Sequence, residues 1–301
     1  MSEFLQQIIN GISLGSIYAL IALGYTMIYG ILRFINFAHG DVFMVGAFIG
    51  FYITPRIMPM VGGNPVLAAI IVFLAAMIGC SALGVIIEKL AYRPLRARPK
   101  LTVLITAIGV SLFLEFGGQL VFGPDPKLFP VLIPSTPIVS SENLVINSNS
   151  VIVIFTALIL MLLLRFIVFN TKMGTAMRAV SFNHRAASLM GINIDTVISF
   201  TFIIGSSLAG AAAVLYASVY PSINPLMGIF PGLKAFVAAV LGGIGNLAGA
   251  AIGGLIIGIT ETFVSGYISS TFRDAIAFAI LILILLFKPS GIFGKNEPEK
   301  V

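Results

Sequence analysis

The chain has 301 residues, of which 58% are hydrophobic and only 9% charged, and its formal net charge is +6. Soluble domains are about 45–50% apolar and about 25% charged, so this composition excludes a water-soluble enzyme and a disordered chain. The basic residues separate apolar stretches instead of forming a soluble patch, which argues against a nucleic-acid partner. The composition is that of a polytopic protein embedded in a lipid bilayer.

Long apolar stretches divide the chain into predicted membrane spans. A spanning helix needs about 20 mostly apolar residues. Stretches of this kind lie at 7–30, 41–60, 66–90, 101–122, 150–169, 194–219 and 273–288. A glycine-rich stretch at 233–265 is too long for one straight helix and too short for two full ones, so we expect a broken or re-entrant pair there. The predicted fold class is an all-α transmembrane helical bundle, forming a single domain over residues 1–301.

The distribution of basic residues predicts the orientation of the bundle. Most of the 17 Lys and Arg residues fall on one side of this span map, which the positive-inside rule makes cytoplasmic. The C-terminus then lies in the cytoplasm and the N-terminus outside it. The polar segment 123–149 also lies outside.

Three polar residues, Asn36, His39 and Asp41, gather where the first span ends. They either line the cytoplasmic end of a path through the membrane or cap the second helix. Asp41 would lie in the first turn of that helix, where a carboxylate offsets the helix dipole. The sequence favours the cap for Asp41.

Glu115 and Glu261 are the carboxylates expected at membrane depth. Acidic side chains are costly there, so their default interpretation is functional. Both fall near the outer ends of their spans, where a carboxylate reaches interfacial water. Arg273 and Asp274 stand at a span start and are available as partners. A role in a transport path and a role in a structural ion pair both stay open.

The loop at 170–193 is the largest predicted cytoplasmic connection, and its middle has the pattern of a short helix. Asn183 is suited to cap the start of this helix, and Gly191 to end it. A short helix lying parallel to the membrane can dock into a groove on a partner. An ordinary solvated loop remains the alternative, and periodicity does not separate the two.

The glycine-rich stretch contains a predicted break and a predicted packing face. Gly242 and Gly243, followed by Asn246, form the expected breakpoint, which exposes half-helix ends either to a central path or to packing. Glycines from 245 to 258 recur every four residues. Small residues at this interval let helix backbones approach closely, so we interpret them as a packing face.

The chain lacks the motifs of catalysis and of cofactor binding. It contains no G-x-x-x-x-G-K-[ST], H-E-x-x-H or G-x-S-x-G sequence. Its single cysteine, Cys80, excludes an internal disulfide and a cysteine-cluster metal site. His39 and His184 lie far apart on separate predicted loops, as interfacial polar residues. We therefore expect no enzyme activity, no metal and no cofactor.

Residues 185–191, RAASLMG, resemble the E-A-A-x-x-x-G loop through which permeases of ATP-binding-cassette (ABC) importers engage their ATPases. Ala186, Ala187 and Gly191 match this pattern, and Arg185 replaces its glutamate. Other segments resemble the branched-chain amino-acid permease family in the same order along the chain. These are GSIYALIALGY at 15–25, NFAHG at 36–40, YRPLR at 92–96, GLKAF at 232–236, LGGIGN at 241–246 and KPSGIFG at 288–294.

This resemblance implies the shorter permease subunit of an importer in the bacterial inner membrane. The implied partners are a second homologous permease, two cytoplasmic ATP-binding subunits on the 183–191 helix, and an external substrate-binding protein. The implied substrates are leucine, isoleucine and valine. Similar permeases are associated with urea, amides or other amino acids, which remain alternatives. An ion-coupled secondary transporter using Glu115 or Glu261 is the alternative from another class.

Overall fold

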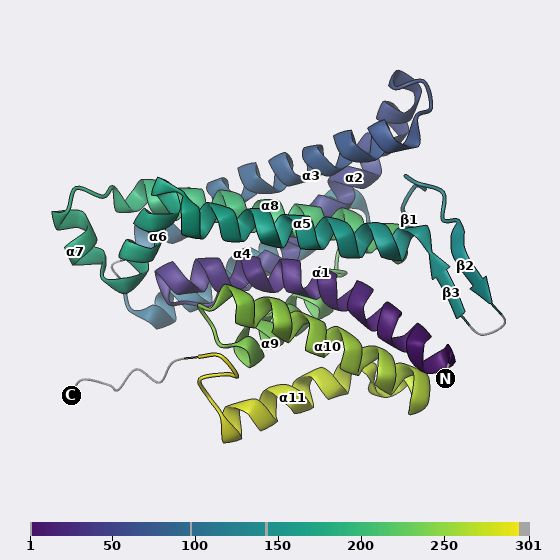
Figure 1. Cartoon of the computed structure of the whole chain (residues 1–301). Helices are drawn as coiled ribbons and strands as arrows, with labels where there is room; N and C mark the ends of the chain where they lie inside the picture. Colours follow the sequence, from purple (N-terminus) through teal and green to yellow (C-terminus); the bar gives the residue numbers. More distant parts are fainter. Residues whose placement is uncertain (1, 97, 142–143, 295–301) are drawn as a thin grey trace.

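The computed structural model of the chain describes residues 2–96, 98–141 and 144–294 (Figure 1). Its helices are α1 (Ser2–Leu32), α2 (His39–Met60), α3 (Pro65–Ile87), α4 (Lys100–Phe122), α5 (Ser148–Asn170), α6 (Lys172–Phe182), α7 (His184–Leu189), α8 (Ile194–Val219), α9 (Ile229–Gly242), α10 (Leu247–Tyr267) and α11 (Arg273–Phe287). Single turns are η1 (Glu88–Tyr92), η2 (Arg93–Leu95) and η3 (Ser270–Phe272). The strands β1 (Lys127–Leu128) and β4 (Ser222–Ile223) pair antiparallel, as do β2 (Pro137–Ser141) and β3 (Leu144–Asn147).

The helices confirm the predicted all-α transmembrane class. Within the described residues, 8 helices are long and apolar enough to cross a membrane, and the predicted spans fall on them. The glycine-rich stretch is broken as expected, at residues 243–246. Of the two helices on either side of this break, α9 is short, with 14 residues, whereas α10 has 21 residues and is of full length. The small strands, and α6 within the predicted 170–193 loop, were not predicted.

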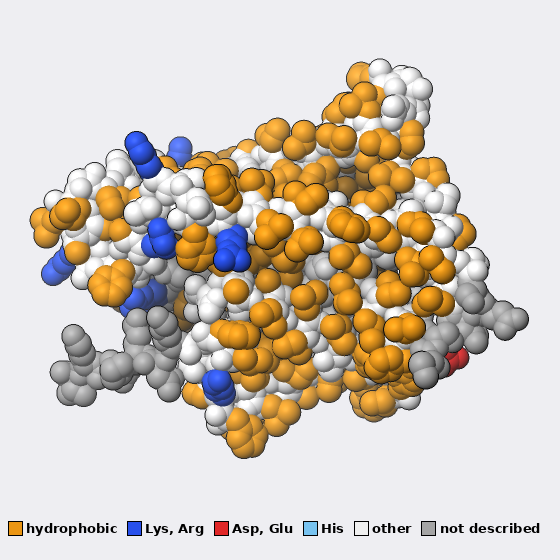
Figure 2. Space-filling model, in the orientation of Figure 1, with side chains coloured by type: hydrophobic (Ala, Val, Ile, Leu, Met, Phe, Trp, Pro, Cys, Tyr) orange, Lys and Arg blue, Asp and Glu red, His pale blue; other side chains and the backbone are white. Residues whose placement is uncertain are grey.

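The bundle has two chemically different ends. Lys and Arg side chains gather around α6 and α7, on the left of Figure 2, and we call this the basic end. The opposite end carries the start of α1 and the β2–β3 hairpin, where the Gln6 side chain accepts a hydrogen bond from the Val145 amide at 2.8 Å. We call it the hairpin end. Between the two ends, hydrophobic side chains dominate the surface, as expected for contact with lipid (Figure 2).

Helix α1 runs through the centre of the bundle and packs closely on α10 (Figure 1). A Cβ atom on Gly258 would lie 2.3 Å from the Cα of Gly15, and one on Gly254 would lie 2.5 Å from the Cα of Ala19. Such distances leave no room for a side chain. These glycines of the predicted packing face therefore allow α10 to approach the backbone of α1.

The same arrangement of elements occurs twice, in opposite directions. The first copy consists of α1, a re-entrant segment at 33–38, α2 and α3. The second copy consists of α8, a re-entrant segment at 220–228, α9 and α10. The contacts repeat in the same way. The packing of α1 on α10 corresponds to that of α8 on α3, and the packing of α4 on α2 corresponds to that of α11 on α9. The structure therefore has the inverted internal symmetry found in many transporters, whose sites lie between the repeats.

Candidate functional site

The two re-entrant segments bring the first turns of α2 and α9 together inside the bundle. A Cβ atom on Gly40 would lie 2.7 Å from the carbonyl oxygen of Gly228, and one on Gly228 would lie 2.2 Å from that of Gly40. The backbones therefore touch, and only glycine fits at either position. We call this contact the Gly40–Gly228 junction.

The junction lies deep within the bundle. Gly24 of α1 faces the ring of His39, the first residue of α2. Gly24 lies about two helical turns before the end of α1 at Leu32, which places it about 12 Å from that end along the helix. Ser111, near the middle of α4, donates a hydrogen bond to Asp41 at 2.5 Å. Because a bilayer core is about 30 Å thick, α2 and α9 begin close to its midplane.

A small polar cavity of about 120 Å³ opens beside the junction. Asp41, Ser111 and Glu115 contribute its polar side chains, and Tyr25 covers one side. The positive ends of two helix dipoles, from α2 and α9, meet at its wall. This combination of dipoles, hydroxyls and carboxylates can bind a small polar solute that carries both charges.

Asn36, His39 and Asp41 are all buried, and their surroundings differ from the predicted loop. Asn36 accepts a hydrogen bond from Tyr92 at 2.5 Å. The His39 ring stacks edge-to-face on Tyr25 at 4.7 Å, and neither of its nitrogens meets a hydrogen-bond partner within the described residues. In the described part of the chain no side chain caps α2 by a hydrogen bond, and Asp41 lies in the first turn of this helix, as expected. His39 is therefore an interior residue and not an interfacial one.

A buried charge cluster joins α1, α9, α10 and α11. Glu261 is 0% exposed, and its Oε1 accepts hydrogen bonds from Lys234 at 2.9 Å, from Tyr18 at 3.3 Å and from Arg273. Lys234 also pairs with Asp274 at 2.5 Å. The expected pairing with a membrane acid is confirmed for Arg273, whereas Asp274 pairs with the cation Lys234. Glu261 does not reach interfacial water, because α1, α9 and α11 surround it.

At the basic end, α7 forms the short helix that the sequence predicts. The Asn183 side chain accepts a hydrogen bond from the Ala186 amide at 3.0 Å, and Gly191 follows with a left-handed φ of 81°. Ala187 is buried, whereas Arg185 and Ala186 are exposed. Three large apolar side chains beside them are also exposed: Phe182 by 84%, Leu189 by 88% and Met190 by 82%. These three side chains form what we call the basic-end apolar patch.

The α6–α7 segment is tied to the re-entrant segment that leads to the junction. His184 Nε2 lies 2.9 Å from the carbonyl oxygen of Ile31, and Arg33 donates to the Ser181 carbonyl at 3.4 Å. Arg33 has a φ of 55°, the single left-handed non-glycine residue among those described. The backbone of this segment is therefore strained where it meets α6 and α7.

A second connection runs through the turns after α3. Asp195, at the start of α8, pairs with Arg93 and Arg96, and Arg96 also pairs with the buried Glu88. Glu88 begins the π-helical turn η1, and Tyr92 ends it. Tyr92 donates a hydrogen bond to Asn36 of the re-entrant segment. Single π turns are frequent at functional sites.

Comparison with known proteins identifies the family. The family model described as "Branched-chain amino acid transport system / permease component" matches residues 7–285. The chain belongs to this permease family. It is 47% identical to the high-affinity branched-chain amino acid transport system permease protein LivH of Salmonella typhimurium, over 99% of this chain and 98% of that protein. The permease BraD of Pseudomonas aeruginosa is 44% identical over the same shares, and LivH of Escherichia coli is 46% identical.

In this permease the predicted break at Gly242, Gly243 and Asn246 lies at the basic end. Gly243 has a φ of 96°, and the amides of Ile292 and Phe293 bond the last carbonyls of α9. The Asn246 side chain caps α10 and donates to the Phe293 carbonyl at 3.2 Å. The half-helix end that faces the interior is the opposite end of α9, at Gly228. Glu115, by contrast, lines the cavity beside the junction as a half-buried side chain.

Sequence reasoning missed Gly40 and Gly228, although a signal for them exists. Both re-entrant segments contain Ile-Asn-x-x-x-Gly, at 35–40 and at 223–228. In each, the glycine is the residue at which the two backbones touch. A search for internal repeats therefore finds the junction from the sequence.

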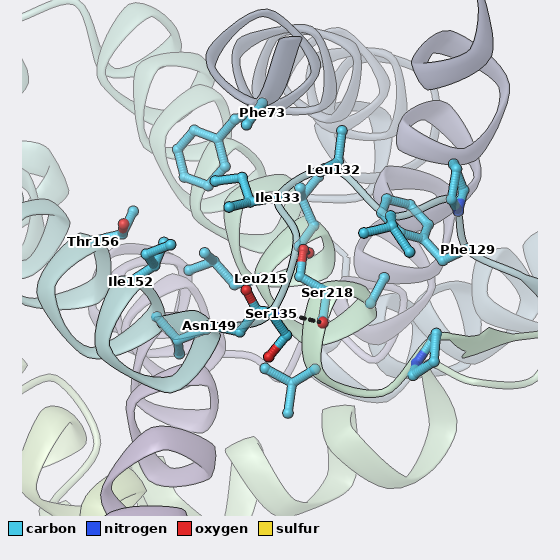
Figure 3. A pocket seen from close by; sticks show the side chains of 18 of the residues that line it. Phe73, Phe129, Leu132, Ile133, Ser135, Asn149, Ile152, Thr156, Leu215 and Ser218 are labelled. Carbon is cyan, nitrogen blue, oxygen red and sulfur yellow. Dashed lines mark hydrogen bonds between the residues drawn. The ribbon is translucent and has the colours of Figure 1, made fainter. Parts of the chain in front are cut away.

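An apolar cavity of about 540 Å³ lies near the hairpin end between α3, α5, α8 and residues 129–135 (Figure 3). Phe73, Ile133 and Leu215 line it, and it has no charged lining residue. Its polar groups are few; Asn149 donates to the Ser218 carbonyl at 3.2 Å. This cavity suits an aliphatic group.

Proposed function

We propose that this chain is a transmembrane subunit of an ATP-driven importer for leucine, isoleucine and valine. The family match and the relatives of nearly the same length, which are named for branched-chain amino acid transport, support the substrate class. The structural observation that carries the proposal is α7, a short helix beside exposed apolar side chains at the basic end. It is bonded to the last turn of α1, directly before the segment that enters the junction.

The basic-end apolar patch is the docking surface for a cytoplasmic ATP-binding subunit. Exposed Phe182, Leu189 and Met190 are costly in water, and burying them against a partner is favourable. Arg185 and Ala186 border the patch. Gly191 shapes its end, and buried Ala187 positions α7 against its neighbours. ATP hydrolysis belongs to separate subunits, because this chain has no phosphate-binding loop.

The basic end faces the cytoplasm of a bacterial inner membrane, and the hairpin end faces outward. Its excess of Lys and Arg supports this orientation through the positive-inside rule. The N-terminus and the β2–β3 hairpin then lie outside, where an external binding protein delivers the amino acid. The whole chain acts as one permease domain.

ATP-driven movement of the docked subunits reaches the junction through α7. Arg33 connects α6 to the re-entrant segment at 33–38, and His184 connects α7 to the end of α1 just before that segment. Asp195 reaches the same segment through the turns after α3. Moving this segment displaces the first turn of α2, which touches α9 at Gly228. A second homologous permease pairs with this one, covers the largely exposed faces of α4 and α11, and completes the path.

Ion-coupled transport fits the structure less well. Glu261 is already engaged by Lys234 and Arg273, so it is poorly suited to exchange an ion in every cycle. Relatives named for branched-chain amino acids favour these substrates over urea and amides.

Affinity purification of the tagged protein from its native membrane tests the assembly. We expect ATP-binding subunits and a second permease to co-purify in mild detergent. Recovery of this chain alone across several detergents would contradict the proposal. Titrating the associated binding protein with leucine, isoleucine, valine and urea then tests the substrate class.

A further inference from the structure

A second polar cavity, of about 400 Å³, lies at the hairpin end and is separate from the junction. The ends of α1, α5, α8, α10 and α11 that face the hairpin enclose it. Its polar lining comes from Gln7, Asn10, Ser13, Ser150, Tyr220, Thr262, Ser265 and Arg273. We call it the outer vestibule.

One wall of the vestibule is a row of side chains on α1. Gln7, Asn10 and Ser13 follow one another at intervals of about one helical turn, so they share a face of the helix. Ser13 is 4% exposed, and its hydroxyl has no hydrogen-bond partner within the described residues. A buried hydroxyl without a partner is costly, and one that lines a polar cavity is explained by a ligand that bonds it.

The opposite wall carries a single cation, Arg273. Its side chain is one-third exposed, its guanidinium carbon lies 5.7 Å from the centre of the Tyr220 ring, and its Nε donates a hydrogen bond to the buried Glu261. These contacts hold the group in place while leaving part of it accessible. An immobilised, partly dehydrated guanidinium is a strong partner for a carboxylate.

An apolar space adjoins this polar one. Ser150 and Val219 line both the outer vestibule and the 540 Å³ apolar cavity of Figure 3. A ligand with a charged head and an aliphatic side chain therefore finds suitable surroundings for both parts. Arg273 of the vestibule bonds Glu261, which also accepts a hydrogen bond from Lys234 of α9, the helix that begins at the junction.

We propose that the outer vestibule binds the head group of the transported amino acid before it reaches the junction. Arg273 contacts the carboxylate, while the Ser13 hydroxyl and the amide oxygens of Gln7 and Asn10 accept hydrogen bonds from the ammonium group. The aliphatic side chain lies toward Val219. This proposal rests on the function proposed above and names a substrate site within it.

Thiol protection in right-side-out membrane vesicles that contain the assembled importer tests the site. Ser265→Cys places a thiol in the vestibule, and Ser270→Cys places one on the same surface outside it. The native Cys80 is buried and serves as background in both variants. We expect leucine to slow labelling of the Ser265→Cys variant by a membrane-impermeant reagent and to leave the Ser270→Cys variant unaffected. Leucinamide, which lacks the carboxylate, and 4-methylpentanoate, which lacks the ammonium, should not protect.

Ser13→Ala in the Ser265→Cys background then tests the hydroxyl. We expect the leucine concentration that gives half protection to rise about tenfold or more, because a hydrogen bond to a charged group is lost. Thermal stability should not fall, since the hydroxyl has no hydrogen-bond partner among the residues that the structure describes. Ser16→Ala is the matched control: it lies on the same helix and is equally buried, but its hydroxyl is bonded to Ile12 at 2.7 Å.

The outcomes separate the vestibule from the transport function. Absence of protection by leucine, equal protection by 4-methylpentanoate, or equal effects of Ser13→Ala and Ser16→Ala would each overturn the vestibule site. The proposed function would stand in those cases if the same membranes took up leucine with ATP. Absence of ATP-dependent uptake would instead contradict the proposed function.

Discussion

Glu261 is stabilised inside the membrane because donors from several helices converge on it. Lys234 and Arg273 balance its charge, and the Tyr18 hydroxyl shares the same oxygen. Its depth and its pairing with Arg273 follow from the sequence. The burial of its partner Lys234 does not follow from the sequence. Lys234 looks interfacial along the chain, but it is an interior residue because α9 begins at mid-depth.

Glu261→Gln should strongly destabilise the protein. The change leaves Lys234, which is 3% exposed, with Asp274 as its one acidic partner among the described residues. Breaking a buried ion pair from one side costs about 3–5 kcal/mol. Labelling of the buried Cys80 by a thiol dye during heating reports unfolding, and we expect a lower midpoint temperature. Glu115→Gln is the control: that side chain is half-buried and has no ion-pair partner among the described residues, so we expect little change. Equal shifts for both variants would contradict this account.

At the scale of elements, two helices that begin inside the membrane define the junction. The sequence predicts that the glycine-rich segment is broken, because its length fits neither one span nor two. It does not predict that α2 also begins inside, because the segment at 33–38 is short and looks like a normal loop. The α7 helix was predictable from its cap and its terminal glycine, whereas its burial pattern, with Ala187 inside, depends on packing against α6 and α8.

Gly228→Ala should disrupt the junction. The added methyl group would overlap the backbone of Gly40, and overpacking of this kind costs about 1–3 kcal/mol. We expect a lower unfolding temperature and loss of uptake. Gly109→Ala on α4 is the matched control, since nothing lies within 4 Å of its added methyl and alanine favours a helix. Normal uptake by the Gly228→Ala variant would show that close contact between α2 and α9 is not required.

Leu189→Asp should prevent docking of the ATP-binding subunit without unfolding the permease. Leu189 is 88% exposed, so the change removes no internal contact of consequence, but it places a charge in the basic-end apolar patch. We expect less ATP-binding subunit to co-purify per permease. Thr175→Asp adds the same charge to an exposed position of α6 and should have no such effect. If as much ATP-binding subunit co-purified with the Leu189→Asp variant as with the wild-type permease, the patch would be excluded as the docking surface.

At the scale of the whole molecule, the inverted repeat explains why the re-entrant segments enter from opposite ends. α2 leaves the junction toward the hairpin end and α9 toward the basic end (Figure 1). Composition and span lengths predicted the bundle, and charge predicted its two ends. The repeat depends on contacts between distant segments, for which the shared Ile-Asn-x-x-x-Gly was the one local sign.

Cysteine accessibility tests the orientation. Arg185→Cys marks the basic end and Met60→Cys the hairpin end, and both positions are exposed. With the basic end in the cytoplasm, an impermeant thiol reagent added to intact cells should label the Met60→Cys variant only. Labelling of the Arg185→Cys variant from outside would show that the basic end faces outward, opposite to the proposed orientation.

Uptake of leucine into proteoliposomes that contain the purified assembly, with its binding protein outside and ATP inside, tests the central claim most directly. We expect uptake to require ATP hydrolysis and to persist when ionophores abolish the ion gradients. Uptake that proceeds without ATP and collapses with the ion gradients would contradict the account and identify a secondary transporter.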